Sequence, residues 1–289
     1  MPREGQPKTA FVFAGGGSFG AIQVGMLHSL AAHGIVADMA FGSSVGAINA
    51  AYYAGDPTIG GIRKLETIWR GLRRQDVFPV TWRTLLGFMR RRDFLVASHG
   101  LRNLIETHLP YRNLEDAKMP IYVVATDILS AETVVLSNGP ACEAILASVA
   151  IPAAFAPVRV SDLFLADGAI SSNTPVKVAV ANGAQRLIIL PTGYACARRT
   201  PPVGAVASAL HALTLLIARQ LISELETLAP HIDYYVLPPL CPLDGSPYDF
   251  SHTGELIARA IASTNEWIDG GGLTLSRTHA QLGLHKHSH

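Results

Sequence analysis

A serine inside a tight glycine turn is the first group in this chain with the type and setting of a nucleophile. The turn reads "GSSVG", in which Gly42, Ser44 and Gly46 satisfy the pattern G-x-S-x-G. This pattern is typical of a strand-to-helix turn that exposes one Ser hydroxyl, with glycines where side chains would clash. An apolar strand precedes it and the helix-forming stretch "AINAAYYA" follows. We therefore predict Ser44 as the nucleophile.

A second glycine turn lies earlier in the chain, in "FVFAGGGSFGAIQVGML". Gly15, Gly17 and Gly20 satisfy G-x-G-x-x-G, which either binds a dinucleotide pyrophosphate or points backbone N–H groups at an oxyanion. A dinucleotide site needs an acidic residue at the end of the second strand, whereas Asp38 precedes that strand. We therefore favour an oxyanion hole built from Gly15, Gly16 and Gly17, with a dinucleotide-binding module as the alternative.

The base that would activate the serine is harder to find. A malonyl-transferase-type acyltransferase would prefer His beside the nucleophile, where this chain has Ser43, and no His has a supporting motif. The stretch "FLADGAISSNTPV" offers a carboxylate instead: Asp167 leaves an apolar strand, and Gly168 lets the chain turn. Most Asp-Gly pairs are simple turns, so the assignment of Asp167 as base depends on the other two motifs. A Ser-dependent acyltransferase stays a further alternative.

Taken together, the three motifs resemble those of the patatin-like phospholipases. "GGGSFG" is similar to the family's oxyanion loop, "GSSVG" to its nucleophile turn and "DGA" to its Asp motif, and "ASVAIPAAFAPV" is similar to the segment before the Asp. The resemblance extends from about Thr9 to Pro191. It implies a Ser44/Asp167 dyad that hydrolyses carboxylic esters of phospholipids or related glycerolipids. The family loop usually has Arg or Lys where this chain has Phe19. Without that cation, the resemblance implies no preference for a particular phospholipid head group.

The elements around these motifs indicate an α/β protein. Continuous apolar strands alternate with helical stretches, which is typical of a mainly parallel sheet covered on both faces. We therefore predict a three-layer α/β/α sandwich in one domain over residues 9–270, followed by a flexible tail at 271–289. Long helices are expected at about 204–229 and 251–269. The first is predicted to pack on the sheet through an apolar stripe of Val206, Leu210, Leu213, Ile217, Leu221, Leu225 and Leu228. The predicted strands are "TAFVFA", "DMAFG", "PIYVVAT", "TVVLS", "DLFLAD", "RLIILPT" and "DYYVLP".

Residues 63–109 differ in composition from the rest and are predicted to form an insertion or cap. Between residues 63 and 102 there are ten basic and three acidic side chains, an excess of seven in a chain of net charge +1. This segment is either a solvated helix surface or a basic, aromatic face that contacts anionic lipid. Its aromatic residues are Trp69, Phe78, Trp82, Phe88 and Phe94.

Composition limits the remaining function classes. A near-zero net charge argues against general nucleic-acid binding, and no group of Asp, Glu, His or Cys has metal-ligand spacing, so we expect neither metal nor cofactor. The apolar stretch 203–218 is too short to span a bilayer comfortably, and the first strand follows "MPREGQPKT" without a leader. Cys142, Cys196 and Cys241 are expected to be reduced thiols. These features predict a cytoplasmic protein with peripheral contact to the inner membrane face.

Overall fold

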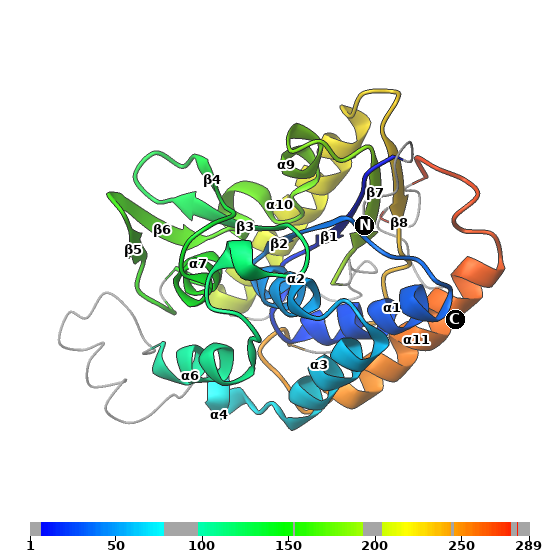
Figure 1. Cartoon of the computed structure of the whole chain (residues 1–289). Coiled ribbons are helices and arrows are strands. Elements are labelled where there is room, and N and C mark those ends of the chain that lie inside the picture. The colour runs from blue at the N-terminus through cyan, green and yellow to red at the C-terminus, as the bar shows by residue number, and fades with distance from the viewer. Residues whose placement is uncertain are drawn as a thin grey trace.

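The computed structural model describes residues 7–77, 98–152, 154–192, 204–243, 246–278 and 282. Its centre is an eight-stranded sheet in the order β5-β6-β3-β2-β1-β7-β8, with β4 paired to β3 (Figure 1). The strands are β1 (Thr9–Phe13), β2 (Met39–Ser43), β3 (Ile121–Asp127), β4 (Thr133–Leu136), β5 (Val158–Val160), β6 (Leu163–Asp167), β7 (Arg186–Leu190) and β8 (Asp233–Val236).

The middle of the sheet is parallel, as its continuous apolar strands predict. β3, β2, β1, β7 and β8 pair in parallel, whereas β4, β5 and β6 add antiparallel pairs around β3 and at the edge. The seven predicted strands are present. The three-residue strand β5 was not predicted, because so short a run has no readable periodicity.

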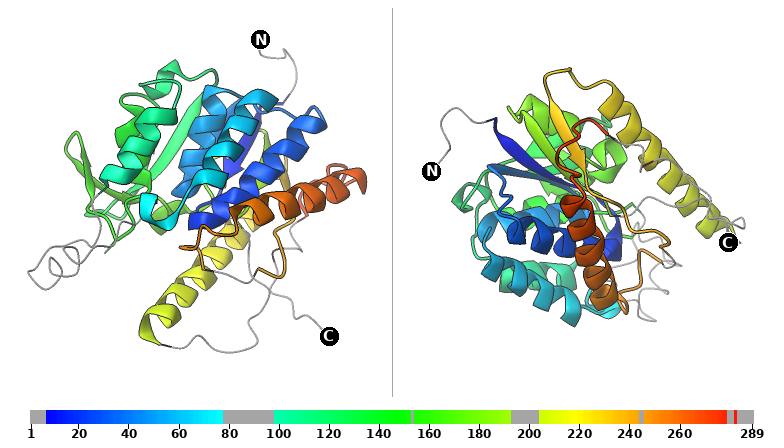
Figure 2. Two further views of the ribbon diagram at one scale, coloured as in Figure 1. Left: turned by 90° about the horizontal axis from the view of Figure 1, so that it is seen from below. Right: turned by 90° about the vertical axis from the view of Figure 1, so that its right-hand side faces the viewer.

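Helices cover both faces of the sheet, so the three-layer prediction is confirmed (Figures 1 and 2). Alternation along β1 directs Phe11 and Phe13 into one core and Ala10 and Val12 into the other. The first core is covered by α1 (Gly20–Ala32), α2 (Val45–Gly55), α3 (Ile59–Gly71), α6 (His99–His108), α7 (Ala141–Ser148) and α11 (Thr253–Asp269). The second is covered by α9 (Val176–Ala181) and α10 (Ala205–Glu226). Shorter elements are α4 (Arg74–Val77), α8 (Ala169–Ser172) and the 3₁₀ turns η1 (Gly17–Phe19) and η2 (Leu114–Asp116).

Helix α10 packs on the sheet only in part. Leu221, Leu225 and Leu228 of its predicted apolar stripe are buried, and Ile217 packs against them. Leu216 is 66% exposed, and Figure 2 shows the N-terminal half of the helix extending past the sheet. The side chains of the other predicted stripe residues, Val206, Leu210 and Leu213, lie outside the described part of the chain.

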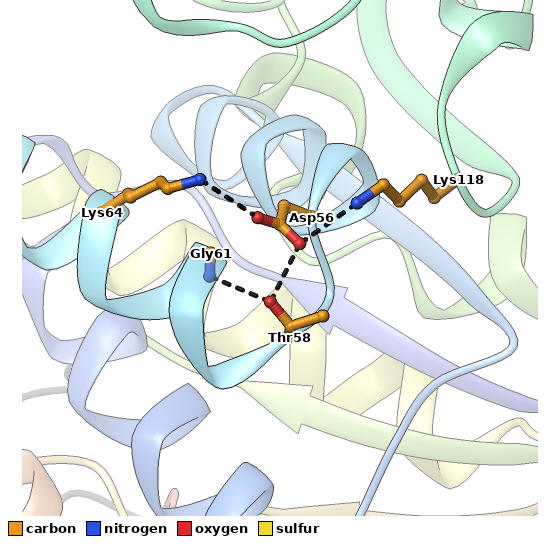
Figure 3. A network of polar contacts seen from close by, with 5 residues as sticks. All are labelled: Asp56, Thr58, Gly61, Lys64 and Lys118. Carbon is orange, nitrogen blue, oxygen red and sulfur yellow. Dashed lines mark hydrogen bonds and ion pairs between the residues drawn. The ribbon is translucent and has the colours of Figure 1, made fainter.

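A small polar network fixes the start of helix α3 (Figure 3). Thr58 Oγ1 accepts a hydrogen bond from Gly61 N at 3.1 Å and donates one to Asp56 Oδ1 at 2.9 Å. Lys64 and Lys118 pair with the same carboxylate at 3.6 Å and 3.3 Å. The hydroxyl and the two lysines together lower the pKa of Asp56.

The segment 63–109 is only partly a surface feature. Trp69 is buried in the first core with 4% of its surface exposed, so its predicted place on a basic, lipid-facing surface is wrong. Its indole N–H donates to Asn49, which draws the ring inward. The other four aromatic residues of the segment, Phe78, Trp82, Phe88 and Phe94, lie outside the described residues.

Two findings bear on the expectations about compartment. Cys142 is a free thiol, whereas Cys241 is disulfide-bonded, so the prediction of three reduced thiols is wrong for Cys241. Within the described residues, no helix is both long enough and apolar enough to cross a membrane.

Candidate active site

Ser44 lies in the sharp turn between β2 and α2, with φ 54° and ψ −130°. A positive φ in a residue with a Cβ costs on the order of 1–3 kcal/mol, so the surrounding structure must impose it. A side chain on Gly42 would meet the carbonyl oxygen of Gly46, and one on Gly46 would meet that of Phe13. The two glycines therefore allow the close packing of α2 on β1 and β2 that forms the turn.

A buried serine holds the backbone of this turn. Ser44 N donates to Ser148 Oγ at 2.9 Å, and Ser148 Oγ donates to the carbonyl oxygen of Val124. Ser148 ends α7 and is fully buried. Sequence reasoning did not single it out, because one Ser in an Ala-rich helix carries no local signal.

The register of β3 explains why Ser44 and Asp167 meet. β2 ends with Ser43 opposite Val124, and β6 ends with Asp167 opposite Ala125. Both residues of β3 also pair with β4, so β2 and β6 must share the other side of β3. Since β2 is parallel and β6 antiparallel to β3, their carboxyl ends converge at one point of the sheet. Residues 123 positions apart in the sequence are thereby brought together.

At this point Ser44 Oγ donates a hydrogen bond to Asp167 Oδ2 at 2.7 Å. The other carboxylate oxygen, Oδ1, accepts from Ala169 N at 2.8 Å. Thr126 Oγ1 fixes the main chain by donating to the carbonyl oxygen of Asp167 at 2.9 Å. The carboxylate is thus aimed at the hydroxyl with its second oxygen already occupied.

Burial changes the acidity of this carboxylate. Asp167 is only 3% exposed, and loss of solvent raises its pKa to about 6, although the hydrogen bonds from Ala169 and Ser44 favour the charged form. A carboxylate with a raised pKa is a stronger base than a solvated one. Asp167 is therefore ionised at neutral pH and can still accept a proton from Ser44.

Two backbone N–H groups of the glycine loop have no acceptor among the described residues. Gly16 and Gly17 are partly exposed, and neither N–H donates to another described residue. Gly15 N, in contrast, donates to the carbonyl oxygen of Asn173 at 3.0 Å, and Ser18 N to that of Pro247 at 2.7 Å. Gly17 has φ 60°, a conformation that favours glycine, and a side chain there would meet Pro247.

A chain of buried polar side chains holds the loop in place. Trp69 Nε1 donates to Asn49 Oδ1 at 2.9 Å, and Asn49 Nδ2 donates to Gln23 Oε1 at 2.7 Å. Gln23 Nε2 in turn donates to the carbonyl oxygens of Ala14 and Leu190 at 2.8 Å and 2.9 Å. The network joins α3, α2 and α1 to the ends of β1 and β7. Such fully satisfied buried networks rigidify the backbone that they contact.

Two further motif glycines allow close packing. A side chain on Gly20 would meet Val45 and the ring of Trp69, and one on Gly168 would meet the carbonyl oxygen of Val124.

Phe19 occupies the position at which the family loop usually has a cation, and it packs against the first core. The structure therefore places an apolar ring, rather than a charge, at this position.

An apolar cavity opens directly onto Ser44. Gly17 and Ser44 form its end at the glycine loop and the nucleophile turn, and almost all of its wall is carbon. Helices α2, α3 and α6 supply most of this wall. The lining side chains are Val45, Ile48, Tyr52, Leu65, Ile68, Trp69, Leu72, Val77, Leu101, Leu104, Val149, Ile151, Phe155 and Phe250.

Two further carboxylates, Asp127 at the end of β3 and Asp38 just before β2, have structural partners. Asp127 accepts hydrogen bonds from Ser130 Oγ at 2.7 Å and Leu129 N at 3.3 Å, which lower its pKa, as expected for a turn residue. Asp38 accepts from Thr9 N at 2.8 Å and ties the start of β1 to that of β2. It therefore lies at the opposite end of these strands from the glycine loop. In the described part of the chain, no three His, Cys, Asp or Glu side chains are grouped as metal ligands.

Comparison with known proteins identifies the family. The sequence model of the patatin-like phospholipases matches residues 11–180. The chain therefore belongs to the patatin-like phospholipase family.

Individual relatives are distant and mostly longer. Patatin-like phospholipase domain-containing protein 7 of Rattus norvegicus is 28% identical over 186 residues, 64% of this chain and 13% of that protein. An uncharacterized NTE family protein of Mycobacterium tuberculosis is 28% identical over 181 residues, 59% of this chain and 45% of that protein. The crystal structure of VipD from Legionella pneumophila shares the fold, with a TM-score of 0.50 and 16% identity over 91% of this chain and 67% of that one.

Proposed function

We propose that this protein is a serine lipid acyl hydrolase that cleaves carboxylic esters of phospholipids or related glycerolipids. The observation that carries the proposal is the 2.7 Å hydrogen bond from Ser44 Oγ to the buried Asp167 Oδ2, at the end of an apolar cavity. Membership of the patatin-like phospholipase family supports it. A lysophospholipase, NTE1 of Scheffersomyces stipitis, is 25% identical over 64% of this chain and 12% of its own length.

The reaction follows from the positions of these two side chains. Asp167 Oδ2 takes the proton of Ser44 as Oγ attacks the ester carbonyl carbon, and the same proton then passes to the oxygen of the departing alcohol. An acyl group remains on Ser44. Asp167 next takes a proton from water, whose oxygen attacks the acyl carbonyl, and the proton returns to Ser44 as the fatty acid leaves.

The negative charge on the carbonyl oxygen needs donors that are already in place. Gly16 N and Gly17 N are free to donate within the described structure, and they lie at the start of the turn η1, which leads into the positive end of α1. Gly15 N is occupied by Asn173, so we narrow the predicted oxyanion hole to Gly16 and Gly17. One such donor contributes about 3 to 4 kcal/mol to lowering the barrier in well-studied acyl-transfer enzymes.

The apolar cavity provides the place for the acyl chain. Hydrocarbon burial is worth about 0.8 kcal/mol for each CH₂ group, so a lipid chain gains more from this cavity than a short ester does.

We keep the predicted contact of residues 63–102 with anionic membrane as part of the proposal. Among its described cations, Arg63 and Lys64 are exposed on α3.

The experiment compares three single substitutions on a soluble p-nitrophenyl ester. Ser44→Ala and Asp167→Asn should each lower kcat by at least about 10³-fold in folded protein, because the nucleophile or its base is gone. Ser43→Ala is the matched control, since it removes the neighbouring hydroxyl, which has no hydrogen-bond partner among the described residues. Comparable losses in Ser43→Ala, or in a His→Ala variant, would reject the dyad.

A further inference from the structure

A second cavity, of about 400 Å³, lies beside the apolar one and is lined by basic side chains. Arg70 comes from the last turn of α3, and Arg73 and Arg74 come from the junction of α3 with α4. The opposite wall is the loop Asp249–Gly254, which leads into α11. Three guanidinium groups thus line one hollow.

Part of this positive charge is uncompensated. Among the described residues, Arg73 and Arg74 form no ion pair, whereas Arg70 Nε donates to Glu66 Oε1 at 2.7 Å. The one lining carboxylate is Asp249, whose Oδ1 already accepts from Ser251 N at 2.9 Å and Ser251 Oγ at 2.7 Å. These bonds, with a smaller contribution from Arg74, lower its pKa and keep it ionised. Arg70 is therefore paired with Glu66, and Arg73 and Arg74 share one lining carboxylate, Asp249.

The start of α11 adds to the attraction for an anion. This helix has 17 residues and begins at Thr253, with no side-chain cap on its first turn. Its first backbone N–H groups and the positive end of its dipole favour negative charge. Thr253 and Gly254 both line the cavity, so these groups lie at its wall.

The basic cavity adjoins the apolar cavity that Ser44 lines. It shares Leu72 and Phe250 with the apolar cavity. The chain just before the loop in its wall contacts the glycine loop, because Ser18 N donates to Pro247 O at 2.7 Å. Tyr248, next to Asp249, is close enough to Asp167 that the carboxylate charge helps to raise the tyrosine pKa, after the larger effect of burial.

We propose that the basic cavity binds the phosphoryl group of a lipid whose acyl chain occupies the apolar cavity. The inference rests on the proposed function and assigns its substrate class: esters that carry a phosphate, such as lysophospholipids. Guanidinium groups match phosphate oxygens in geometry and charge, and Arg73 and Arg74, which form no ion pair with a described residue, make an anion site together with the helix N-terminus. The cavity is much larger than a phosphate group, so glycerol oxygens can enter with it.

The test uses two soluble substrates that differ only in the phosphate: 1-octanoyl-glycerol 3-phosphate and 1-octanoyl-glycerol, each below its micellar concentration. The wild-type protein should have the higher kcat/KM on the phosphate ester. In Arg73→Gln/Arg74→Gln the ratio of the two kcat/KM values should fall at least about tenfold, since charge-assisted hydrogen bonds are lost. Arg112→Gln/Arg159→Gln removes two exposed cations that line neither cavity and should leave the ratio unchanged.

Other outcomes are equally informative. An unchanged ratio in Arg73→Gln/Arg74→Gln, with wild-type protein active on both substrates, overturns the phosphoryl assignment but leaves the proposed function intact. A wild-type protein that hydrolyses neither ester overturns the proposed function itself. Inorganic phosphate should compete with the phosphate ester. If instead it alters hydrolysis of the neutral ester without competing with the phosphate ester, the cavity is a site for free anions and the lipid assignment is wrong.

Discussion

The two cavities that meet at Leu72 and Phe250 are opposite in chemistry. One is almost entirely carbon and contains Ser44, whereas the other is lined by three arginines. The separation of the arginines from Asp167 matters, because a guanidinium beside this carboxylate would lower its pKa and make it a weaker base. Its buried surroundings instead raise the pKa of Asp167 to about 6. Under the proposed function, the basic cavity holds the anionic group of the lipid, while the carbon-lined cavity keeps Asp167 a strong base.

After substitutions of Ser44 and Asp167 themselves, the largest expected effect comes from the glycine loop that lines the apolar cavity. Gly17→Ala should lower kcat about 100-fold, because φ 60° disfavours a side chain and the new Cβ would meet Pro247, moving an oxyanion donor. Gly34→Ala is the matched control, since Gly34 has φ 69° but no atom within 4 Å of the added Cβ. Equal losses in the two variants would mean that backbone strain, and not the oxyanion hole, is responsible.

The acidity of Asp167 predicts a pH profile. Its ionised form is the active one, so kcat/KM on a neutral ester should rise with pH around a midpoint of about 6 and then level off. Below the midpoint the rate should fall about tenfold for each pH unit. Circular dichroism at each pH separates this titration from unfolding. A midpoint near 4 would mean that the carboxylate is solvated and that the apolar wall does not control it.

How far the sequence predicts this site depends on the range of the contacts. The roles proposed for Ser44 and Asp167 and the parallel sheet follow from local patterns, because a tight turn or a buried strand restricts its own residues. The basic cavity does not follow from local patterns, since it is formed by residues 70–74 and residues 249–254, which are far apart in the sequence. Trp69 was misplaced for the same reason: its partner Asn49 is on another helix, and composition does not report that contact.

A smaller effect is expected from the basic segment beyond α4. Replacing Arg90, Arg91 and Arg92 with Gln should lower activity on anionic vesicles several-fold, because each cation near an anionic membrane contributes about 1 kcal/mol. Hydrolysis of a soluble ester should stay the same. Vesicle binding should weaken as salt rises, since the attraction is screened over about 8 Å in physiological salt. Equal losses on both substrates would mean that the segment stabilises the fold or covers the active site and does not bind the membrane.

The smallest effect concerns stability. Burial raises the pKa of Asp167 from 3.8 to about 6, so the folded protein binds the proton more tightly than the unfolded chain. This group therefore lowers the free energy of unfolding as pH rises from about 4 to 6, by about 3 kcal/mol in total. Asp167→Asn should accordingly raise Tm by a few degrees at pH 8 and much less at pH 4. An equal or lower Tm at pH 8 would show that the buried charge costs no stability.

Covalent labelling tests the central claim most directly. A fluorophosphonate probe reacts with an activated serine, and mass spectrometry of the digested protein locates the adduct. The account predicts one adduct on Ser44, absent in Ser44→Ala, retained in Ser43→Ala and formed far more slowly in Asp167→Asn. Adduct formation on a different residue, or an ester-hydrolysing protein that takes no label, would contradict the assignment of Ser44 and Asp167 as the catalytic pair.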